Sequence, residues 1–160
     1  MLKISKYPDP ILRKRAKIIT NFDQALFDLA ENMASIMYQD DGIGLAAPQV
    51  SESLRLIVVG NEAAQGYKVY VNPEITFRSK DTGISEEGCL SLPKIFGLVR
   101  RAKKIHVKYQ DLSGKVFKEK LAGLEAIILQ HEFDHLEGIL FIDRAEKITR
   151  GQEILDSLKP

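Results

Sequence analysis

Residues 131–135 of this chain are His-Glu-Phe-Asp-His, a pattern whose residue types and spacing suit a metal ion. On an α-helix, side chains four positions apart lie on one face, so both imidazoles can reach the same ion. Glu132 is offset by one residue, so its carboxylate can lie beside the ion without binding it. There it can take a proton from water and pass it to a leaving group. The pattern predicts a metal-dependent hydrolase that works through His131, Glu132 and His135.

A catalytic metal site also needs a third protein ligand and an open position for water. Upstream, residues 87–91 are Glu-Gly-Cys-Leu-Ser and contain Cys89, the only cysteine of the chain. A thiolate is a good ligand for first-row divalent ions, so Cys89 is the favoured candidate beside an incomplete His/His pair. The alternative is a downstream carboxylate, offered by Glu137, Asp143, Glu146 and Glu153.

A third segment, Gly42–Gln49, combines two glycines with small apolar residues and ends in an amide side chain. The glycines allow close packing and close approach of a substrate backbone. A turn leading into the next strand would explain the glycines but not the neutral donor Gln49. Such a donor is useful for an oxyanion that develops at a metal centre.

The composition fits one domain without a strongly charged surface. The chain has 160 residues, of which 44% are apolar and 28% charged, and a net charge of +1. We therefore expect neither DNA nor a membrane as a partner, and we interpret the basic runs Lys14–Lys17 and Arg100–Lys104 as solvated faces. A single cysteine excludes an intramolecular disulfide, and no apolar run resembles a signal peptide or a membrane span. These features predict a cytoplasmic protein with one domain, residues 1–160.

Helices are expected near both ends of the chain. Asp9 and Pro10 are typical of a helix start, which predicts a short turn through residues 11–15. Apolar residues at helical spacing predict a longer helix over 22–39, capped by Asn21 or Asp23. The His-Glu-Phe-Asp-His motif falls in a predicted helix over 124–136, and a polar helix is expected over 149–158.

Strands are expected in the middle of the chain, over 54–59, 67–71, 75–78, 105–109 and 116–120. The Asn72-Pro73 pair should separate the second strand from the third. The last two strands should form a hairpin, with His106 at the surface. Helices, then strands, then helices favour an α+β fold.

Taken together, the three motifs resemble those of the peptide deformylase family. The family's motifs are G-x-G-L-A-A-P-Q, E-G-C-L-S and H-E-x-x-H, and they match residues 42–49, 87–91 and 131–135 in the same order. The N-terminal residues 7–13 also resemble the family's opening segment. The resemblance implies an α+β fold in which antiparallel strands surround a central helix that carries the H-E-x-x-H motif.

The resemblance also implies a role for each motif residue. Cys89, His131 and His135 would bind one divalent ion, with water as the fourth ligand that attacks the formyl carbon. Glu132 would be the general base and acid, and Gln49 with the backbone N–H of Leu90 would stabilise the oxyanion. The native ion of the family is generally Fe²⁺, although Zn²⁺, Ni²⁺ or Co²⁺ can occupy the site.

The implied substrates are N-formylmethionyl peptides and nascent chains, from which the family releases formate; association with the ribosome is left open. We expect an apolar slot for the methionine side chain beside the His131 ring, lined by Ile43, Gly44, Leu124 and Ile127. Leu124 and Ile127 lie on the predicted helix, and for them the alternative to lining the slot is packing in the helix core. We also expect Arg101 to pair with Glu87 and to orient the Cys89 loop, the alternative being an ordinary surface ion pair.

Two other functions remain open from the residues alone. One is an H-E-x-x-H protease with a downstream carboxylate ligand, and the other is a structural metal site or a relative that only binds formyl-peptides. Glu132 and Gln49 argue against the second, because structural sites rarely keep a spare carboxylate. The chain departs from the family's pattern at Ser51, where Gly is frequent, and at Phe96, near which some relatives carry an arginine.

Overall fold

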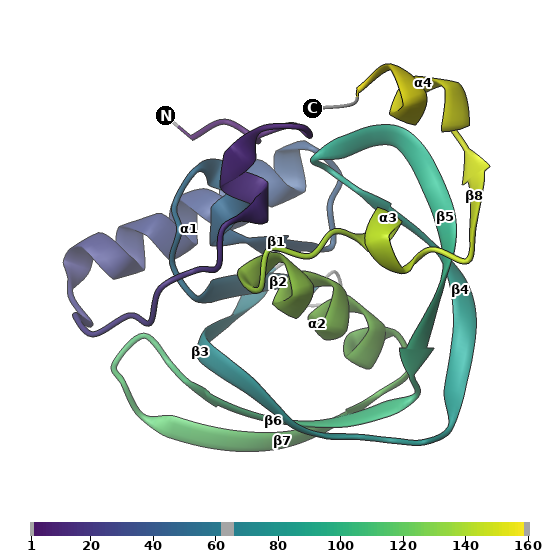
Figure 1. Ribbon diagram of the computed structural model, residues 1–160. Helices are drawn as coiled ribbons and strands as arrows, with labels where there is room; N and C mark the ends of the chain where they lie inside the picture. Colours follow the sequence, from purple (N-terminus) through teal and green to yellow (C-terminus); the bar gives the residue numbers. More distant parts are fainter. Residues whose placement is uncertain (1, 62–65, 159–160) are drawn as a thin grey trace.

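The computed structural model describes residues 2–61 and 66–158, which form helices and two antiparallel sheets (Figure 1). The helical segments are η1 (Pro10–Arg13), α1 (Gln24–Gln39), η2 (Ala47–Val50), α2 (Gly123–Leu136), α3 (Phe141–Arg144) and α4 (Gln152–Ser157). The strands are β1 (Gly44–Ala46), β2 (Leu56–Asn61), β3 (Gly66–Arg78), β4 (Thr82–Cys89), β5 (Leu92–Ala102), β6 (Lys104–Gln110), β7 (Val116–Ala122) and β8 (Lys147–Arg150). The predicted α+β class is confirmed.

The two sheets differ in size and lie around α2. One has the strand order β1-β2-β3-β6-β7, and the other has the order β4-β5-β8. Helix α2 contacts strands of both sheets, and in Figure 1 it runs through the middle of the molecule while β3, β6 and β7 curve around it. The helix that carries the metal motif is therefore central, as the resemblance implied.

The central position of α2 follows from residues that are buried on several of its sides. Ala126, Leu129 and Leu136 join an apolar cluster with the five-stranded sheet. His131 and His135 are also buried, together with Gln130, Glu132 and Asp134. Buried polar groups are costly unless they are hydrogen-bonded or bind an ion. This helix therefore brings a concentrated set of polar groups to the centre of the fold.

The predicted start of the first helical segment is confirmed, whereas the helix predicted over 22–39 begins two residues later, at Gln24. The Asp9 carboxylate accepts a hydrogen bond from the backbone N–H of Ile11, and Pro10 is the first residue of η1. Of the two proposed caps for α1, Asp23 is the one used, because its side chain accepts from the backbone N–H of Leu26. Among the described residues, no helix has the length and apolar character needed to cross a bilayer.

The predicted break at Asn72-Pro73 is wrong, because β3 continues through it to Arg78. The strand absorbs the proline through a register shift between Val71 and Glu74 in its pairing with β6. Asn72 has a φ of 50°, and its side chain hydrogen-bonds both backbone groups of Ile19. A bulge thus replaces the expected end of the strand.

The C-terminal prediction also needs correction. The expected helix over 149–158 is shorter, because residues up to Arg150 form β8 and only Gln152–Ser157 are helical. Gly151, with a φ of 81°, separates the two elements. The strands β1, β4 and β5 were not predicted, although β4 and β5 carry most of the Cys89 region.

Candidate metal centre

Cys89 and the two histidines meet at one point of the fold. Cys89 ends β4, whereas His131 and His135 lie one turn apart on α2, and the three ligand atoms all lie within 4.8 Å of one another. The Cys89 Sγ lies 3.4 Å from His135 Nε2. Two ligands of a tetrahedral ion, with metal–sulfur and metal–nitrogen bonds of usual length, are about 3.6 Å apart. The donor set and its spacing therefore fit a divalent ion.

Glu87 sets the orientation of the His131 ring. Its Oε1 lies 2.8 Å from His131 Nδ1, so the Nδ1–H donates to the carboxylate and Nε2 is left for the ion. Arg101 donates from Nε and Nη2 to the two oxygens of Glu87, each at 2.9 Å. Burial disfavours the charged carboxylate, but the hydrogen bonds from Arg101 and His131 outweigh it and lower the pKa of Glu87 to about 2.

The pair between Arg101 and Glu87 is not a surface ion pair. Only 4% of the Arg101 side chain and 6% of the Glu87 side chain are exposed. Our interpretation of the run Arg100–Lys104 as a solvated face is thus wrong for Arg101, which β5 turns inward. Removal of one partner from such a buried pair leaves a charge without compensation.

Sequence reasoning missed two further members of this charge network. Asp134, between the two histidines, accepts from Arg101 Nη1 at 2.6 Å. It also accepts from Arg144 of α3, at 2.7 Å and 3.1 Å. Asp134 occupies an unspecified position of the H-E-x-x-H pattern. In the sequence, the only indication of a role for Asp134 is its position between the two histidines. Nothing in the sequence indicates a role for Arg144.

Gln49 lies at the centre as predicted, held by its own short helix η2. The backbone N–H of Ala46 donates to Gln49 Oε1 at 3.0 Å, which fixes the orientation of the amide. The Nε2 group therefore faces Cys89 Sγ at 3.4 Å and Ser91 Oγ at 3.2 Å. Ser91, which is fully buried, is a site residue to which we had assigned no role.

Glu132 is also buried beside the ligands, but its hydrogen bonding differs from that of Glu87. Within the described part of the chain, its Oε1 has no hydrogen-bond partner. Burial raises the pKa of Glu132 to about 7, a value suited to taking and returning a proton near neutral pH. A Cβ added at Gly44 would lie 2.8 Å from Glu132 Oε2, so glycine is needed there to admit the carboxylate.

The surroundings of the two histidines shift their pKa values in opposite directions. Burial works to lower the pKa of His131, but the charge of Glu132 and contacts with Cys89 and Glu87 raise it well above its usual value. Burial and the charge of His131 both lower the pKa of His135. The site is therefore polarised even before an ion binds.

A cavity of about 880 Å³ opens onto these groups. Its lining includes the catalytic candidates Gln49, Leu90 and Glu132, together with the expected slot residues Ile43, Gly44, Leu124 and Ile127. The side chain of Leu124 is 64% exposed, which excludes the alternative of helix core for this residue. Ile127 is half-buried, and Ile128, which we had not predicted as a site residue, also lines the cavity.

Three of the four alternative carboxylate ligands form ion pairs with arginines instead. Glu137 pairs with Arg15 and Arg55, Asp143 pairs with Arg13, and Glu146 pairs with Arg100. Glu153 is an exposed residue of the short helix α4. Among the described residues, the group that could hold an ion is Cys89, His131 and His135, and it includes none of the downstream carboxylates that an H-E-x-x-H protease would use.

The two departures from the family's pattern have local explanations. Ser51 adopts a φ of 64°, the region that glycine favours, and its hydroxyl lies 2.7 Å from that of Ser5. The Phe96 ring covers Gly88, where an added Cβ would lie 2.7 Å from the ring. Gly88 therefore admits the aromatic ring that bounds one side of the cavity.

Comparison with known proteins gives the same answer as the motifs. The family model described as polypeptide deformylase matches residues 1–151. The chain belongs to the peptide deformylase family. A peptide deformylase of Desulfotalea psychrophila is 47% identical over 155 residues, covering 94% of this chain and 91% of that protein. One from Thermotoga neapolitana is 44% identical, covering 99% and 98%.

Solved structures of deformylases share the fold. The crystal structure of peptide deformylase from Thermotoga maritima has a TM-score of 0.88 and 47% identity, covering 91% of this chain and 98% of that one. The enzyme from Plasmodium falciparum has a TM-score of 0.90 and 41% identity, covering 98% and 94%. The family membership that the three motifs indicated is thus confirmed over nearly the whole chain.

Proposed function

We propose that this chain hydrolyses the N-formyl group from the N-terminal methionine of newly made polypeptides and that Glu132 moves the proton. One observation carries the proposal: the ligand atoms of Cys89, His131 and His135 lie within 4.8 Å of one another, in a cavity of about 880 Å³ that is also lined by Glu132. The Oε1 of this buried carboxylate has no hydrogen-bond partner among the described residues. Membership of the deformylase family supplies the substrate class.

Cys89, His131 and His135 would hold the ion, which when bound lowers the pKa of water and polarises the formyl oxygen. Glu132 takes a proton from the attacking water as the oxygen–carbon bond forms. It then delivers that proton to the amine nitrogen as the carbon–nitrogen bond breaks, which leaves formate and a free N-terminus. Burial raises the pKa of this carboxyl, which favours its taking up the proton in the first transfer.

Gln49 and Leu90 would stabilise the negative charge that develops on the formyl oxygen. The Gln49 amide is held by the Ala46 N–H, so Nε2 is oriented toward the centre before substrate arrives. The backbone N–H of Leu90 directly follows Cys89 in the chain, and Leu90 lines the same cavity. Donors that are already oriented need no rearrangement during the reaction, which is why such groups lower the barrier effectively.

The methionine side chain would occupy the apolar part of the cavity. Ile43, Leu124 and Ile127 line it, and the first two are too exposed to serve as core residues. Gly44 would allow the substrate backbone to approach while it admits the Glu132 carboxylate. Binding of an unbranched apolar side chain there would orient the formyl group toward Gln49 and Glu132.

Further aspects of the proposal rest on the family and on composition. We propose Fe²⁺ as the native ion, with zinc, nickel or cobalt as substitutes, because a Cys/His/His set suits each of them. The catalytic unit would be the single domain 1–160, acting in the cytoplasm on nascent chains at the ribosome. Co-sedimentation with translating ribosomes would test the last point.

The decisive experiment is an assay of formate release from a formyl-methionyl peptide. The enzyme is prepared without oxygen and loaded with Fe²⁺, and a parallel sample is treated with a chelator. We expect release that the chelator abolishes and that added metal restores. Absence of formate with every metal, in a protein shown to be folded and loaded, would refute the proposal.

A further inference from the structure

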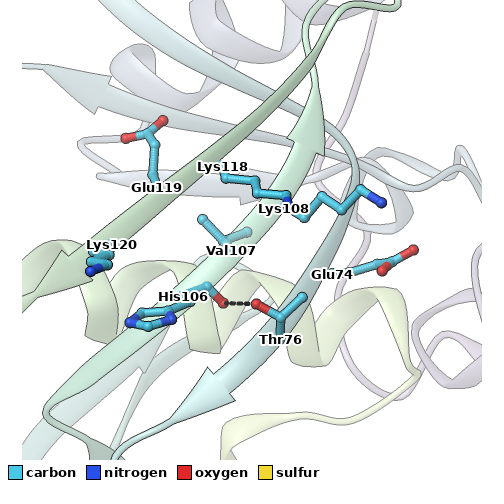
Figure 2. Close-up of a pocket in the computed structure, with 8 residues that line it drawn as sticks. All are labelled: Glu74, Thr76, His106, Val107, Lys108, Lys118, Glu119 and Lys120. Carbon is cyan, nitrogen blue, oxygen red and sulfur yellow. Dashed lines mark hydrogen bonds between the residues drawn. The ribbon is translucent and has the colours of Figure 1, made fainter.

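The outer face of β6 and β7 is strongly basic although the chain as a whole is nearly neutral. Lys104, Lys108, Lys118 and Lys120 are exposed on these two strands. Lys108, Lys118 and Lys120, which we call the lysine face, line a hollow of about 550 Å³ together with Glu74, Thr76 and His106 (Figure 2). Within residues 2–61 and 66–158, none of these three lysines forms an ion pair.

The strand register arranges these side chains in two rows across the sheet. Glu74 of β3 is opposite Lys108, which is opposite Lys118. In the adjacent row, Phe77 is opposite His106, which is opposite Lys120. Residues directly opposite in antiparallel strands share a face, so each row presents its side chains to the same side of the sheet.

Lys108 is opposite an acidic residue, Glu74, on one side and a like charge, Lys118, on the other. Like charges directly opposite in an antiparallel ladder destabilise it, whereas opposite charges stabilise it. A bound anion would relieve the repulsion between Lys108 and Lys118.

The second row adds an aromatic surface beside the cations. The Phe77 and His106 rings are 4.6 Å apart between centroids, and Phe77 is 47% exposed. A flat, exposed ring next to lysines is the combination that binds single-stranded nucleic acid, where bases stack on aromatic groups and lysines neutralise phosphates. Bases in a duplex are not available for such stacking.

We propose that the lysine face, with Phe77 and His106, binds single-stranded RNA. Two other anionic partners account for fewer of these features. A flat anionic membrane would contact the lysines but would not fill the hollow. An acidic protein segment would pair with the lysines but would not need the exposed ring of Phe77. The net charge of +1 does not oppose this proposal, because it averages the exposed lysines with acidic residues of the whole chain, including Glu74 and Glu119 at the hollow. The face lies outside the cavity that holds Glu132, so binding there leaves the catalytic groups untouched.

The test measures binding of a short fluorescent oligouridine RNA by anisotropy at several salt concentrations. The variant Lys108→Gln/Lys118→Gln/Lys120→Gln should bind at least about tenfold more weakly. Its plot of log affinity against log salt should lose about 2 from its slope, because each phosphate contact on a single strand contributes about 0.7. Phe77→Ala should weaken binding about tenfold with an unchanged slope, because it removes stacking and no charge.

The matched control is Lys3→Gln/Lys14→Gln/Lys17→Gln, which removes the same charge from exposed lysines of the N-terminal segment. It should keep most of the affinity, and all variants should release formate from a free formyl-methionyl peptide at the wild-type rate. That second readout separates failure of this proposal from failure of the proposed deformylation.

Three outcomes would overturn the proposal. The first is a wild-type protein that does not bind the oligonucleotide at low salt. The second is an equal loss of affinity in the control and in the variant of the lysine face. The third is binding to vesicles that contain phosphatidylserine without binding to RNA, which would assign this face to a membrane.

Discussion

Glu87 accepts a hydrogen bond from Nδ1 of His131 at 2.8 Å, and this contact determines which nitrogen of the ring faces the ion site. The carboxylate is itself held at both oxygens by Arg101. The ligand is thus oriented by a residue from β4, which in turn is oriented by a residue from β5. Partners of this kind commonly change metal affinity by 10- to 100-fold when removed.

Arg101→Ala should therefore weaken metal binding by about 10- to 100-fold. It should also lower the free energy of unfolding by about 3–5 kcal/mol, because Glu87 and Asp134 would remain buried without their cation. Competition with a coloured chelator measures the first effect, and urea denaturation measures the second. Arg100→Ala, at an exposed neighbour paired with Glu146, should cost no more than about 1 kcal/mol. Equal effects of the two substitutions would contradict the role we assign to Arg101.

Glu132→Gln should keep the metal and lose turnover. The amide preserves the shape of the side chain but cannot take a proton, so formate release should fall by about 10²- to 10⁴-fold. Metal content is measured by elemental analysis of the purified protein. Glu125→Gln, at an exposed position of the same helix, is the control and should be active. Loss of metal from Glu132→Gln would instead make Glu132 a structural residue.

Cys89→Ala should abolish stable metal binding, because it removes one of three protein ligands. Ser91→Ala, two residues away, removes only a hydroxyl that accepts from Gln49 and should retain the ion. Elemental analysis after dialysis distinguishes the two variants. Full metal occupancy in Cys89→Ala would revive the alternative of a carboxylate ligand.

Gly44→Ala should reduce turnover while metal content is unchanged. The added Cβ would come within 2.8 Å of Glu132 Oε2 and 2.9 Å of Ile128 Cγ2, so the carboxylate must move. We expect a loss of about 10²-fold in formate release, as for misplacement of a catalytic group by about an ångström. In the control Gly83→Ala, the nearest atom is 3.5 Å away in the flexible Lys103 side chain. A fully active Gly44→Ala enzyme would show that this contact does not position Glu132.

Glu87 should make the metal-free protein sensitive to acid. Its pKa is lowered from 4.5 to about 2 in the folded state, so its contribution to stability is complete above pH 4.5 and is lost as the pH falls toward 2. Over that range it should add up to about 1.4 kcal/mol per pH unit to the slope of unfolding free energy. Urea denaturation at several pH values should show a shallower slope for Glu87→Gln than for the exposed control Glu86→Gln. Equal slopes of unfolding free energy against pH in the two variants would refute the lowered pKa that we assign to Glu87.

The sequence predicted most of the site because the chemistry lies in short motifs. Helical spacing brought His131 and His135 to one face of α2, and Cys89 was chosen by its ligand chemistry. The network behind them was only partly predictable. Arg101 lies in a run of basic residues that resembles a solvated strand, and only the pairing of β4 with β5 shows that it turns inward.

Two of the missed strands, β4 and β5, have a common physical cause. Residues 82–102 contain Gly83, Gly88, Pro93 and Gly97, which lower the strand propensity of this segment. Some of the buried residues in the segment are charged, so the segment lacks a clear alternation of apolar and polar residues. Their strand state depends on pairing with distant residues, as for Phe96 with Arg150 of β8. By contrast, the β6–β7 hairpin was predictable, because its turn and its alternation of apolar and polar residues are local.

The ion site joins two layers that are also connected by buried hydrogen bonds and ion pairs, such as those of Glu87 with His131 and of Arg101 with Asp134. Cys89 belongs to the three-stranded sheet, and the histidines belong to a helix packed on the five-stranded one. An ion held by all three residues binds the folded chain and not the unfolded one, so it adds about 1.4 kcal/mol to stability for each tenfold excess over its dissociation constant. Metal limitation in a cell therefore lowers the amount of intact enzyme as well as its activity, because chains without the ion unfold and are degraded more often.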